Sequence, residues 1–257
     1  MLRLSVPLQR LRRVPVLGDL LHLVSHRILP ASHREWVQIR TGPGRGLWLE
    51  LNPRTGGDYL RGRAESRVQE ALAARLRPGM VFYDLGANIG LFSLLAARIV
   101  GPTGRVYSFE PDTEVVARLR RNVERNGFSN VTVVESGVWS SNEDVRFIPS
   151  DSSSPDRGLG RIEIAGGGSG RLIRCVTLDD FQGDAPDAIK CDVEGAEFAA
   201  LKGAEILLRW HRPWIICEMH SAENDRASRG FLSRCGYSLE SIDDSHILAV
   251  PSATRIG

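Results

Sequence analysis

The residues most suited to chemistry lie in one short segment, Asp84-Leu85-Gly86-Ala87-Asn88-Ile89-Gly90, between a predicted strand and a predicted helix. Its glycines let the backbone turn tightly and approach a ligand, and the helix that follows offers free N–H groups at its start. Glu110 ends the next predicted strand, 20 residues after Gly90. A carboxylate at that position can accept hydrogen bonds from both hydroxyls of an adenosine ribose. The segment therefore predicts a nucleoside site at the carboxyl ends of the strands.

The charge of this segment distinguishes two classes of ligand. A dinucleotide needs an uncharged G-x-G-x-x-G turn, because its pyrophosphate lies against the backbone there. Here the spacing is G-x-x-x-G, and Asp84 comes just before the first glycine. A carboxylate would repel a pyrophosphate but would suit the ammonium and sulfonium groups of S-adenosylmethionine. The charge favours S-adenosylmethionine over NAD, and a purely structural turn is the remaining alternative.

Two further groups of polar residues follow later predicted strands. Asp192, Glu194 and Glu197 come directly after the strand at 187–191, and Glu218 and His220 lie at the end of the strand at 214–218. The carboxyl ends of parallel strands meet at one edge of a sheet, so both groups should face the same cleft as the glycine segment. Two structural alternatives stay open. Glu197 could simply favour the start of a helix, and His220 could be a structural histidine.

The elements that must position these residues alternate between strand and helix, which predicts a largely parallel sheet covered on both faces. Strands are predicted at 80–84, 106–109, 131–134, 187–191, 214–218, 237–242 and 246–250, with helices at about 64–76, 91–99, 114–125, 196–209 and 223–234. A short turn joins the last two strands, so they should pair antiparallel at an edge. The glycine-rich stretch at 140–180 predicts a flexible hairpin beside the sheet. Its residues 150–170 are either a lid over the acceptor or a variable loop.

Composition excludes several classes of protein. The 257 residues are 42% hydrophobic and 25% charged, which excludes a wholly disordered or collagen-like chain. A net charge of +2 is too balanced to indicate a nucleic-acid partner. No apolar stretch approaches the roughly 20 residues that span a bilayer, and prolines and arginines interrupt any secretory signal. The four cysteines lack CxxC spacing, so we expect buried thiols and a cytoplasmic location.

Residues 1–55 are predicted to form a separate, basic and helical segment ahead of a domain at 56–257. Leu17, Leu20, Leu21 and Val24 recur at helical spacing and indicate a short amphipathic helix. Base rates favour packing of this helix on the main domain. The alternative is a weak contact with a membrane surface or a partner.

Several motifs together resemble the FkbM-type methyltransferase family. The matching pieces are Val81–Gly90, Val106–Asp112, Asn122–Asn126 with Asn130-Val131, Ala188–Glu197 with Leu201–Ala204, and Pro213–His220. The resemblance covers about residues 55–250. Two positions depart from it: Cys191 stands where an aliphatic residue is commoner, and Ala64-Glu65 replaces an aromatic-Glu pair. Neither departure touches the predicted chemistry.

The resemblance implies a class I methyltransferase (Rossmann-like) α/β fold that uses S-adenosylmethionine, with a mostly parallel seven-stranded sheet and an antiparallel last strand. It implies that the glycine segment lines the methionine half of the cofactor, that Glu110 holds the ribose, and that the residues after the third strand flank the adenine. The cofactor-binding residues are then Asp84, Gly86, Ala87, Asn88, Gly90, Glu110, Pro111, Ser136, Gly137 and Val138. The implied reaction is methylation of a hydroxyl group on a small molecule, sugar or glycan.

A hydroxyl group is a poor nucleophile until it loses its proton, so such a reaction needs a base or a metal. Asp192 and His220 are the predicted bases. Alternatively, Asp192 and Glu218 could hold Mg²⁺, because carboxylate oxygens suit that ion. The direct base is favoured slightly, so no metal site is assigned.

Three other functions stay open as alternatives. A methyltransferase acting on RNA or protein is disfavoured, because acids occupy the place where base methylation often uses an N/D-P-P-Y/F motif. A cofactor-binding module without catalysis would bind S-adenosylmethionine and never turn over. An NAD-dependent dehydrogenase is the most distant alternative. The sequence holds no motif that indicates an acceptor or an oligomeric state.

Overall fold

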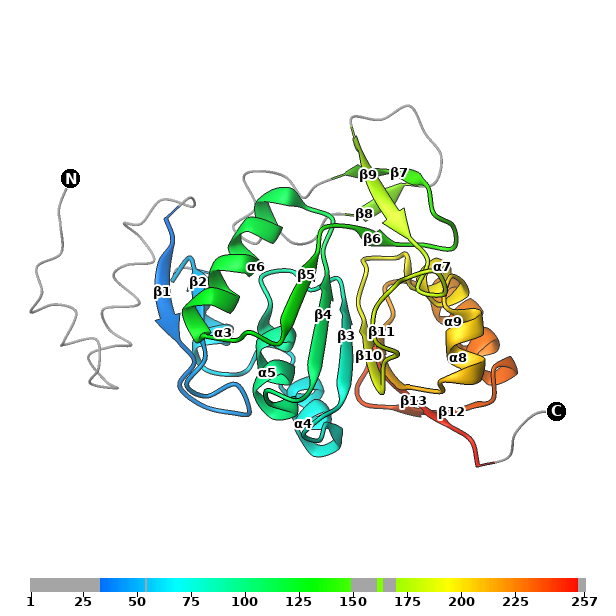
Figure 1. Ribbon diagram of the computed structural model, residues 1–257, viewed down its shortest axis with the longest axis horizontal. Coiled ribbons are helices and arrows are strands. Elements are labelled where there is room, and N and C mark those ends of the chain that lie inside the picture. Colours follow the sequence, from blue (N-terminus) through cyan, green and yellow to red (C-terminus); the bar gives the residue numbers. More distant parts are fainter. Residues whose placement is uncertain (1–32, 54, 149–160, 164–169, 254–257) are drawn as a thin grey trace, which may run out of the picture.

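The fold is built on a central sheet of seven strands in the order β12-β13-β11-β10-β3-β4-β5 (Figure 1). The structure is a computed structural model that describes residues 33–53, 55–148, 161–163 and 170–253. The strands are β3 (Val81–Leu85), β4 (Arg105–Phe109), β5 (Val131–Val134), β10 (Ala188–Cys191), β11 (Trp214–Glu218), β12 (Tyr237–Ser241) and β13 (His246–Pro251). Only β13 runs antiparallel to its neighbours, β11 and β12. The mostly parallel sheet with an antiparallel last strand is confirmed, and so is the antiparallel pairing of the last two strands at an edge.

Helices cover both faces of this sheet. They are α3 (Gly57–Leu60), α4 (Ser66–Arg75), α5 (Leu91–Val100), α6 (Thr113–Asn126), α7 (Glu197–Lys202), α8 (Glu205–Trp210) and α9 (Ala222–Arg234). Figure 1 shows α4, α5 and α6 on one side of the strands and α7, α8 and α9 on the other. The helix predicted at 196–209 is therefore two short helices, with Gly203 between them.

Two hydrophobic cores follow from the alternation of side chains along each strand. On β3, Phe82 packs with α4 and α5, whereas its neighbour Tyr83 packs with the core under α7 to α9. On β11, Ile216 lies in the same core as Phe82, and Cys217 lies in the same core as Tyr83. Strands buried on both faces read as continuous apolar runs, and this is why they could be located from the sequence.

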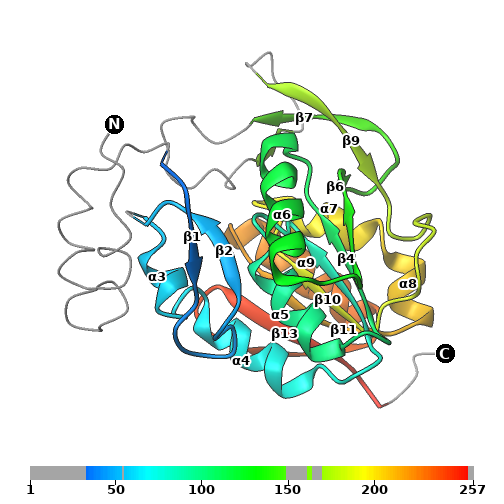
Figure 2. The same cartoon turned by 60° about the vertical axis from the view of Figure 1, so that its left-hand side comes forward.

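A β-hairpin that the sequence did not predict lies against α6. It consists of β1 (Glu35–Gln38) and β2 (Trp48–Leu51). In Figure 2 the hairpin stands beside α6, at the opposite end of the molecule from α8. Leu49 and Leu51 are buried in the same core as α4 and α5. The hairpin thus shares the core of the main domain, and the proposed division at residue 55 stays a prediction.

Two asparagines of α6 join the hairpin to the helix. Asn126 accepts a hydrogen bond from the Trp48 N–H (2.9 Å) and donates one to the Trp48 carbonyl (2.8 Å). Asn122 accepts from the Glu50 N–H (2.8 Å) and donates to the Ile89 carbonyl (2.7 Å). Because Ile89 belongs to the glycine segment, Asn122 ties that segment to the hairpin.

A second sheet of four strands, in the order β6-β9-β7-β8, lies above the central sheet in Figure 1. Its strands are β6 (Gly137–Val138), β7 (Asp144–Ile148), β8 (Arg161–Glu163) and β9 (Arg171–Val176). The predicted hairpin is confirmed by the antiparallel pairing of β7 with β9 and β8. The residues of the suggested lid at 149–160 and 164–169 lie outside the described part of the chain.

The amphipathic helix predicted at residues 17–24 also lies outside the described residues. Within the described ranges, no helix is both long enough and apolar enough to cross a membrane. The four cysteines are buried and free. Cys191 and Cys217 face each other in register on β10 and β11.

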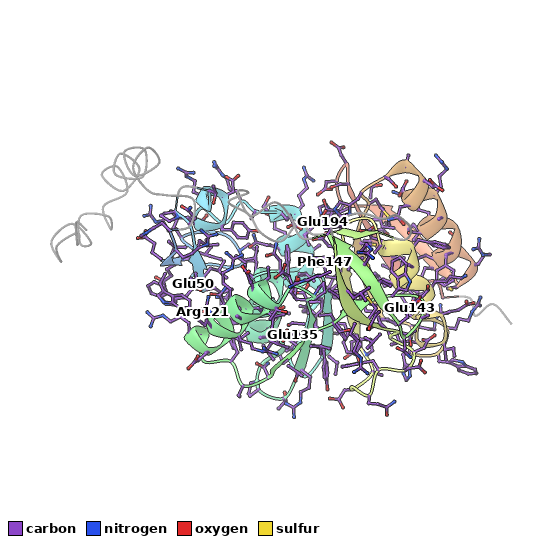
Figure 3. The ribbon with its side chains drawn as sticks, turned by 90° about the horizontal axis from the view of Figure 1, so that it is seen from above. Glu50, Arg121, Glu135, Glu143, Phe147 and Glu194 are labelled. Atoms are coloured by element: carbon purple, nitrogen blue, oxygen red, sulfur yellow. The ribbon has the colours of Figure 1, made fainter. Side chains whose placement is uncertain are left out.

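We predict that Asn122→Ala lowers the free energy of unfolding by at least about 2 kcal/mol, because it leaves a backbone N–H and a carbonyl without their partners. Chemical denaturation in urea measures the change. The neighbouring Arg121→Ala is the control, since it removes only the exposed ion pair with Glu50, worth less than about 1 kcal/mol. Figure 3 shows Glu50 and Arg121 close together on the hairpin side of the molecule. Equal losses of unfolding free energy in the two variants would show that the buried hydrogen bonds of Asn122 do not anchor the hairpin.

Candidate functional site

A cavity of about 370 Å³ opens where β3, β4, β10 and β11 end. Its lining residues are Tyr59, Glu65, Gly86, Asn88, Phe109, Glu110, Pro111, Asp112, Ser136, Gly137, Val138, Phe147, Asp192, Val193, Glu194, Glu218 and His220. Phe147 comes from the second sheet, so that sheet forms part of the wall. Seen from above, Phe147 and Glu194 lie near each other in the middle of the molecule (Figure 3). The cavity joins the predicted cofactor residues to the predicted bases.

The glycine segment packs tightly against the end of β10. Gly86 has φ 74°, and a Cβ placed on it would lie 1.8 Å from the Asp192 carbonyl oxygen. Gly90 has φ 95°, and its Cβ would lie 2.3 Å from Leu119 Cδ1 on α6. Any side chain at Gly86 would therefore push the strand ends apart. The backbone contact thus requires a glycine at position 86, whereas at position 90 glycine is favoured mainly by the positive φ.

Glu110 is fixed by two backbone hydrogen bonds. Its carboxylate accepts from the Asn88 N–H (2.9 Å) and the Asp112 N–H (2.9 Å). The side chain lines the cavity although only 5% of the residue is exposed. Burial raises the pKa of Glu110 to about 7, and the two N–H groups offset only part of that effect. Each carboxylate oxygen keeps a second lone pair that can accept from a ribose hydroxyl.

Asp84 lies behind the cavity wall, fully buried. Its Oδ2 accepts a hydrogen bond from Ser93 Oγ (2.6 Å), and its Oδ1 has no hydrogen-bond partner. Burial raises the pKa of Asp84, and nearby Lys190 opposes the rise. Ala87 and Gly90 are likewise not among the described residues that line the cavity. Asp84 lies in β3, Ala87 in the loop that follows it, and Gly90 at the N-cap of α5, so these three residues support the site from behind.

The remaining predicted cofactor residues line the cavity directly. Pro111 follows Glu110, and Ser136, Gly137 and Val138 lie where β5 passes into β6. Ser136 Oγ donates to the carbonyls of Gly137 (2.9 Å) and Arg174 (3.0 Å), which fixes this turn against β9. The cavity thus contacts seven of the ten residues assigned to cofactor binding: Gly86, Asn88, Glu110, Pro111, Ser136, Gly137 and Val138.

The lining is strongly acidic. Six of the lining residues carry carboxyl groups: Glu65, Glu110, Asp112, Asp192, Glu194 and Glu218. No lysine or arginine is among its described lining residues. The field inside therefore favours a cationic ligand and disfavours a pyrophosphate. The preference for S-adenosylmethionine over NAD, predicted from Asp84 in the sequence, is better supported by the acidic residues of the whole lining.

A buried ion pair organises the acceptor side. Lys190 is 2% exposed, and its Nζ lies 2.8 Å from Asp192 Oδ2 and 4.7 Å from the centre of the Phe92 ring. Burial alone would raise the pKa of Asp192, but the Lys190 ammonium outweighs it and the pKa is lowered. Asp192 is therefore ionised near neutrality, with its Oδ1 left to face His220.

His220 is oriented by Glu197. Its Nδ1 donates to Glu197 Oε1 (2.8 Å), and its Nε2 lies 3.3 Å from Glu194 Oε2 and 3.6 Å from Asp192 Oδ1. The hydrogen bond to Glu197 raises the pKa of His220 to about 9. Burial raises the pKa of Glu194 to about 7. The structure thus brings His220, Asp192 and Glu194 together at one corner of the cavity.

Glu197 does more than favour the start of a helix. It is fully buried and also accepts hydrogen bonds from the Gly195 N–H (2.9 Å) and the Asn224 side chain. Glu218 lies in a different cluster from Asp192, grouped with Glu65 and His246. The Asp192–Glu218 pairing imagined for Mg²⁺ is not the grouping that the structure forms.

Sequence reasoning gave no role to several residues of this region, among them Glu65, Phe147 and His246. Of these three, only Glu65 carried a signal, because it stands in the Ala64-Glu65 pair of the family resemblance. Phe147 and His246 reach the site through long-range packing that no local pattern reveals.

Comparison with known proteins decides the family. A family model described as the methyltransferase FkbM domain matches residues 84–239, more than half of the chain. The chain belongs to the FkbM methyltransferase family. It is a methyltransferase that depends on S-adenosylmethionine, and the resemblance read from the motifs is confirmed.

Two similar proteins and one structure that shares only the fold illustrate the comparison. The hexuronic acid methyltransferase AglP of Haloferax volcanii is 29% identical over 225 residues, which are 82% of this chain and 90% of that protein. The crystal structure of methyltransferase FkbM from Methylobacillus flagellatus is 26% identical, with a TM-score of 0.50, over 68% of this chain. This chain spans only 44% of that protein. A Thermotoga maritima O-methyltransferase, 14% identical over 76% of this chain and 67% of its own with a TM-score of 0.50, shares the class I fold.

We predict that Gly86→Ala reduces cofactor affinity at least tenfold, because the new Cβ meets the Asp192 carbonyl in addition to the strain of a positive φ. Gly127→Ala is the matched control, since Gly127 has φ 71° in the left-handed helical region with nothing within 4 Å of its Cβ. The control should lose only about 1–2 kcal/mol of stability and keep its affinity. Calorimetric titration with S-adenosylmethionine measures both. Equal affinities would show that the close approach is unimportant.

We predict that S-adenosylmethionine binds the wild-type protein more weakly as the pH falls below about 7. The ionised Glu110 is the better acceptor for ribose hydroxyls, so binding must compete with a proton below its pKa. The affinity should fall by up to about tenfold per pH unit below that value and level off above it. Glu110→Gln should bind weakly with no such slope. Because the ligand itself titrates in the same way with both proteins, comparing the two pH profiles removes its contribution. A parallel slope in both proteins would exclude Glu110 as its source.

Proposed function

We propose that this FkbM methyltransferase transfers the methyl group to oxygen, and that its acceptor is a hydroxyl group of a sugar or glycan. The observation that carries this proposal is the oriented His220, set beside Asp192 and Glu194 in the cavity that the cofactor residues also line. The likeness to a hexuronic acid methyltransferase supports a carbohydrate acceptor. Small-molecule hydroxyls of similar polarity belong to the same class.

The charge of the cavity lining supports S-adenosylmethionine as the cofactor held there. Gly86 and Asn88 would lie beside its methionine half, Glu110 would accept from its ribose hydroxyls, and Ser136 to Val138 would flank its adenine. When bound, this cofactor supplies a methyl group on a positively charged sulfur. The acidic lining suits that charge, and the fixed Glu110 carboxylate suits the ribose.

The residues on the acceptor side hold the hydroxyl group and take its proton. Asp192 and His220 are the proposed base groups, with Glu194 beside them and Glu218 further along the wall. Because the hydrogen bond to Glu197 raises the pKa of His220 to about 9, Asp192 is the base at neutral pH, and His220 can accept a proton only where it has lost its own. Glu197 keeps the His220 ring in one orientation, and Lys190 keeps Asp192 in place. Holding the acceptor oxygen in line for displacement can itself lower the activation free energy by about 7 kcal/mol or more. Mg²⁺ bound between Asp192 and Glu218 is not part of this proposal.

An RNA acceptor is the less favoured alternative. Six carboxyl groups line the cavity, and they would repel a phosphate backbone. We also propose a cytoplasmic location, because Cys191 and Cys217 face each other as free thiols, as expected in a reducing compartment.

We predict that His220→Ala and Asp192→Asn lower methyl transfer to a hexuronic acid or hexose glycoside by at least about 100-fold. His220→Ala should bind S-adenosylmethionine within about twofold of wild type. Asp192→Asn should bind it a few times more weakly, since it removes one carboxylate of the lining and the charged partner of Lys190. Mass spectrometry of a panel of glycosides detects the added methyl group, and calorimetry gives the cofactor affinity.

His211→Ala is the control for this experiment, because His211 is exposed at the end of α8. Retained cofactor affinity shows that each variant is folded. Full turnover in both His220→Ala and Asp192→Asn would contradict the assignment of these residues as the base. Methylation of RNA in preference to every glycoside would reject the carbohydrate acceptor.

A further inference from the structure

A second histidine cluster lies at the cavity edge, and the reaction proposed above does not use it. It consists of Glu65 at the start of α4, Glu218 at the end of β11 and His246 at the start of β13. His246 Nε2 lies 3.4 Å from Glu65 Oε2 and 3.4 Å from Glu218 Oε2. All three atoms lie within 4.8 Å of one another. Glu65 and Glu218 both line the cavity.

The imidazole of His246 is held in one orientation from behind. Its Nδ1 donates to Asp243 Oδ1 (2.8 Å). Asp243 is itself fixed, because the same oxygen accepts from the backbone N–H groups of Ser245 (3.1 Å) and His246 (2.9 Å). Nε2 therefore points at the two glutamates. Histidines that bind metals are oriented in this way, by a carboxylate on the other ring nitrogen.

Two buried atoms of the cluster have no hydrogen-bond partner. His246 is 5% exposed, and its Nε2 lies 3.4 Å from each of two carboxylate oxygens without a well-directed hydrogen bond to either. Glu65 Oε2 is also buried without a hydrogen bond. Polar atoms are rarely left so in a folded protein, which points to a ligand between them.

The distances suit a metal ion. Ligand atoms that each lie about 2.0–2.2 Å from one ion are separated by roughly 2.8–3.1 Å in octahedral geometry and by roughly 3.3–3.6 Å in tetrahedral geometry. The two separations of 3.4 Å from Nε2 fall in the tetrahedral range. Three carboxylates, those of Glu65, Glu218 and Asp243, surround the single imidazole, so a dication would also balance their charge.

We propose that Glu65, Glu218 and His246 bind a divalent transition-metal ion at the cavity edge. One nitrogen and two oxygen ligands suit Mn²⁺, Fe²⁺ or Zn²⁺, whereas Mg²⁺ prefers oxygen ligands alone. The ion faces the cavity through Glu65 and Glu218, and its remaining positions are open to water or to oxygens of an acceptor. Binding of the ion needs neither cofactor nor turnover, so this inference can fail while the proposed function stands.

A similar cluster of Asp192, Glu194 and His220 is the weaker candidate. The Lys190 ammonium lies 2.8 Å from Asp192 and already supplies a positive charge there. His220 is also more exposed than His246, with 24% of its side chain accessible against 6%. The two clusters therefore serve as internal controls for each other.

The test titrates the full-length protein, stripped with a chelator, with MnCl₂ and follows the free Mn²⁺ signal by electron paramagnetic resonance. We expect one tight site per chain, with a nitrogen coupling in the pulsed spectrum. His246→Gln should abolish that coupling and weaken binding at least tenfold. Glu65→Gln should weaken it similarly, and Asp243→Asn should weaken it about 10–100-fold by releasing the ring.

Circular dichroism checks that each variant is folded, and if His246→Gln is not, Glu65→Gln decides the question. His220→Gln should leave the Mn²⁺ affinity unchanged. Loss of Mn²⁺ binding in His220→Gln with retention in His246→Gln would overturn the assigned ligands. Absence of tight binding of both MnCl₂ and ZnCl₂ would overturn the site, leaving His246 as a protonated partner of the carboxylates. Binding of MgCl₂ as tight as that of MnCl₂ would overturn the choice of a transition metal.

Discussion

The close approach of Gly86 to the end of β10 is the constraint on which the rest of the site depends. Only a glycine with positive φ lets the loop after β3 lie against the Asp192 carbonyl. The Asp192 N–H also donates to the Leu85 carbonyl (3.1 Å), so the two strand ends are joined from both sides. The wall that shapes the cofactor half of the cavity is thus the backbone that carries the Asp192 carboxylate. The backbone at Gly86 and Asp192 therefore belongs to both the cofactor side and the acceptor side of the cavity.

Much of this architecture could be predicted because it is local in sequence. Buried strands appear as apolar runs, the glycine spacing marks the turn, and Glu110 follows its strand at a fixed distance. The hairpin at 35–51 could not be found in this way. Its strands have four residues each, and its anchors are Asn122 and Asn126, 72 and 78 positions along the chain from their partners. Asparagine side chains, and not a further strand, bond the backbone of β2, and such anchors leave no periodic pattern in the sequence.

The acidic residues after β10 show a different limit of sequence reasoning. Their position in the cleft could be predicted from the topology, but their separate roles could not. Asp192 is kept ionised by Lys190, Glu194 titrates nearer neutrality through burial, and Glu197 is withdrawn from the cavity to orient His220. Three similar side chains within six residues therefore have three different environments. The neighbour that acts on Asp192 is local, because Lys190 lies on β10. The neighbours of Glu197 are His220, after β11, and Asn224 on α9, and only the fold brings them near.

The antiparallel last strand explains why a second histidine reaches this edge. In a parallel strand the first residue lies at the far edge of the sheet, away from the ligand. Because β13 runs in the opposite direction, its first residue, His246, is in register with Glu218, the last residue of β11. The turn before β13 also carries Asp243, which orients the ring. The strand that departs from the parallel pattern therefore adds a nitrogen donor to an edge that parallel strands have lined with carboxylates.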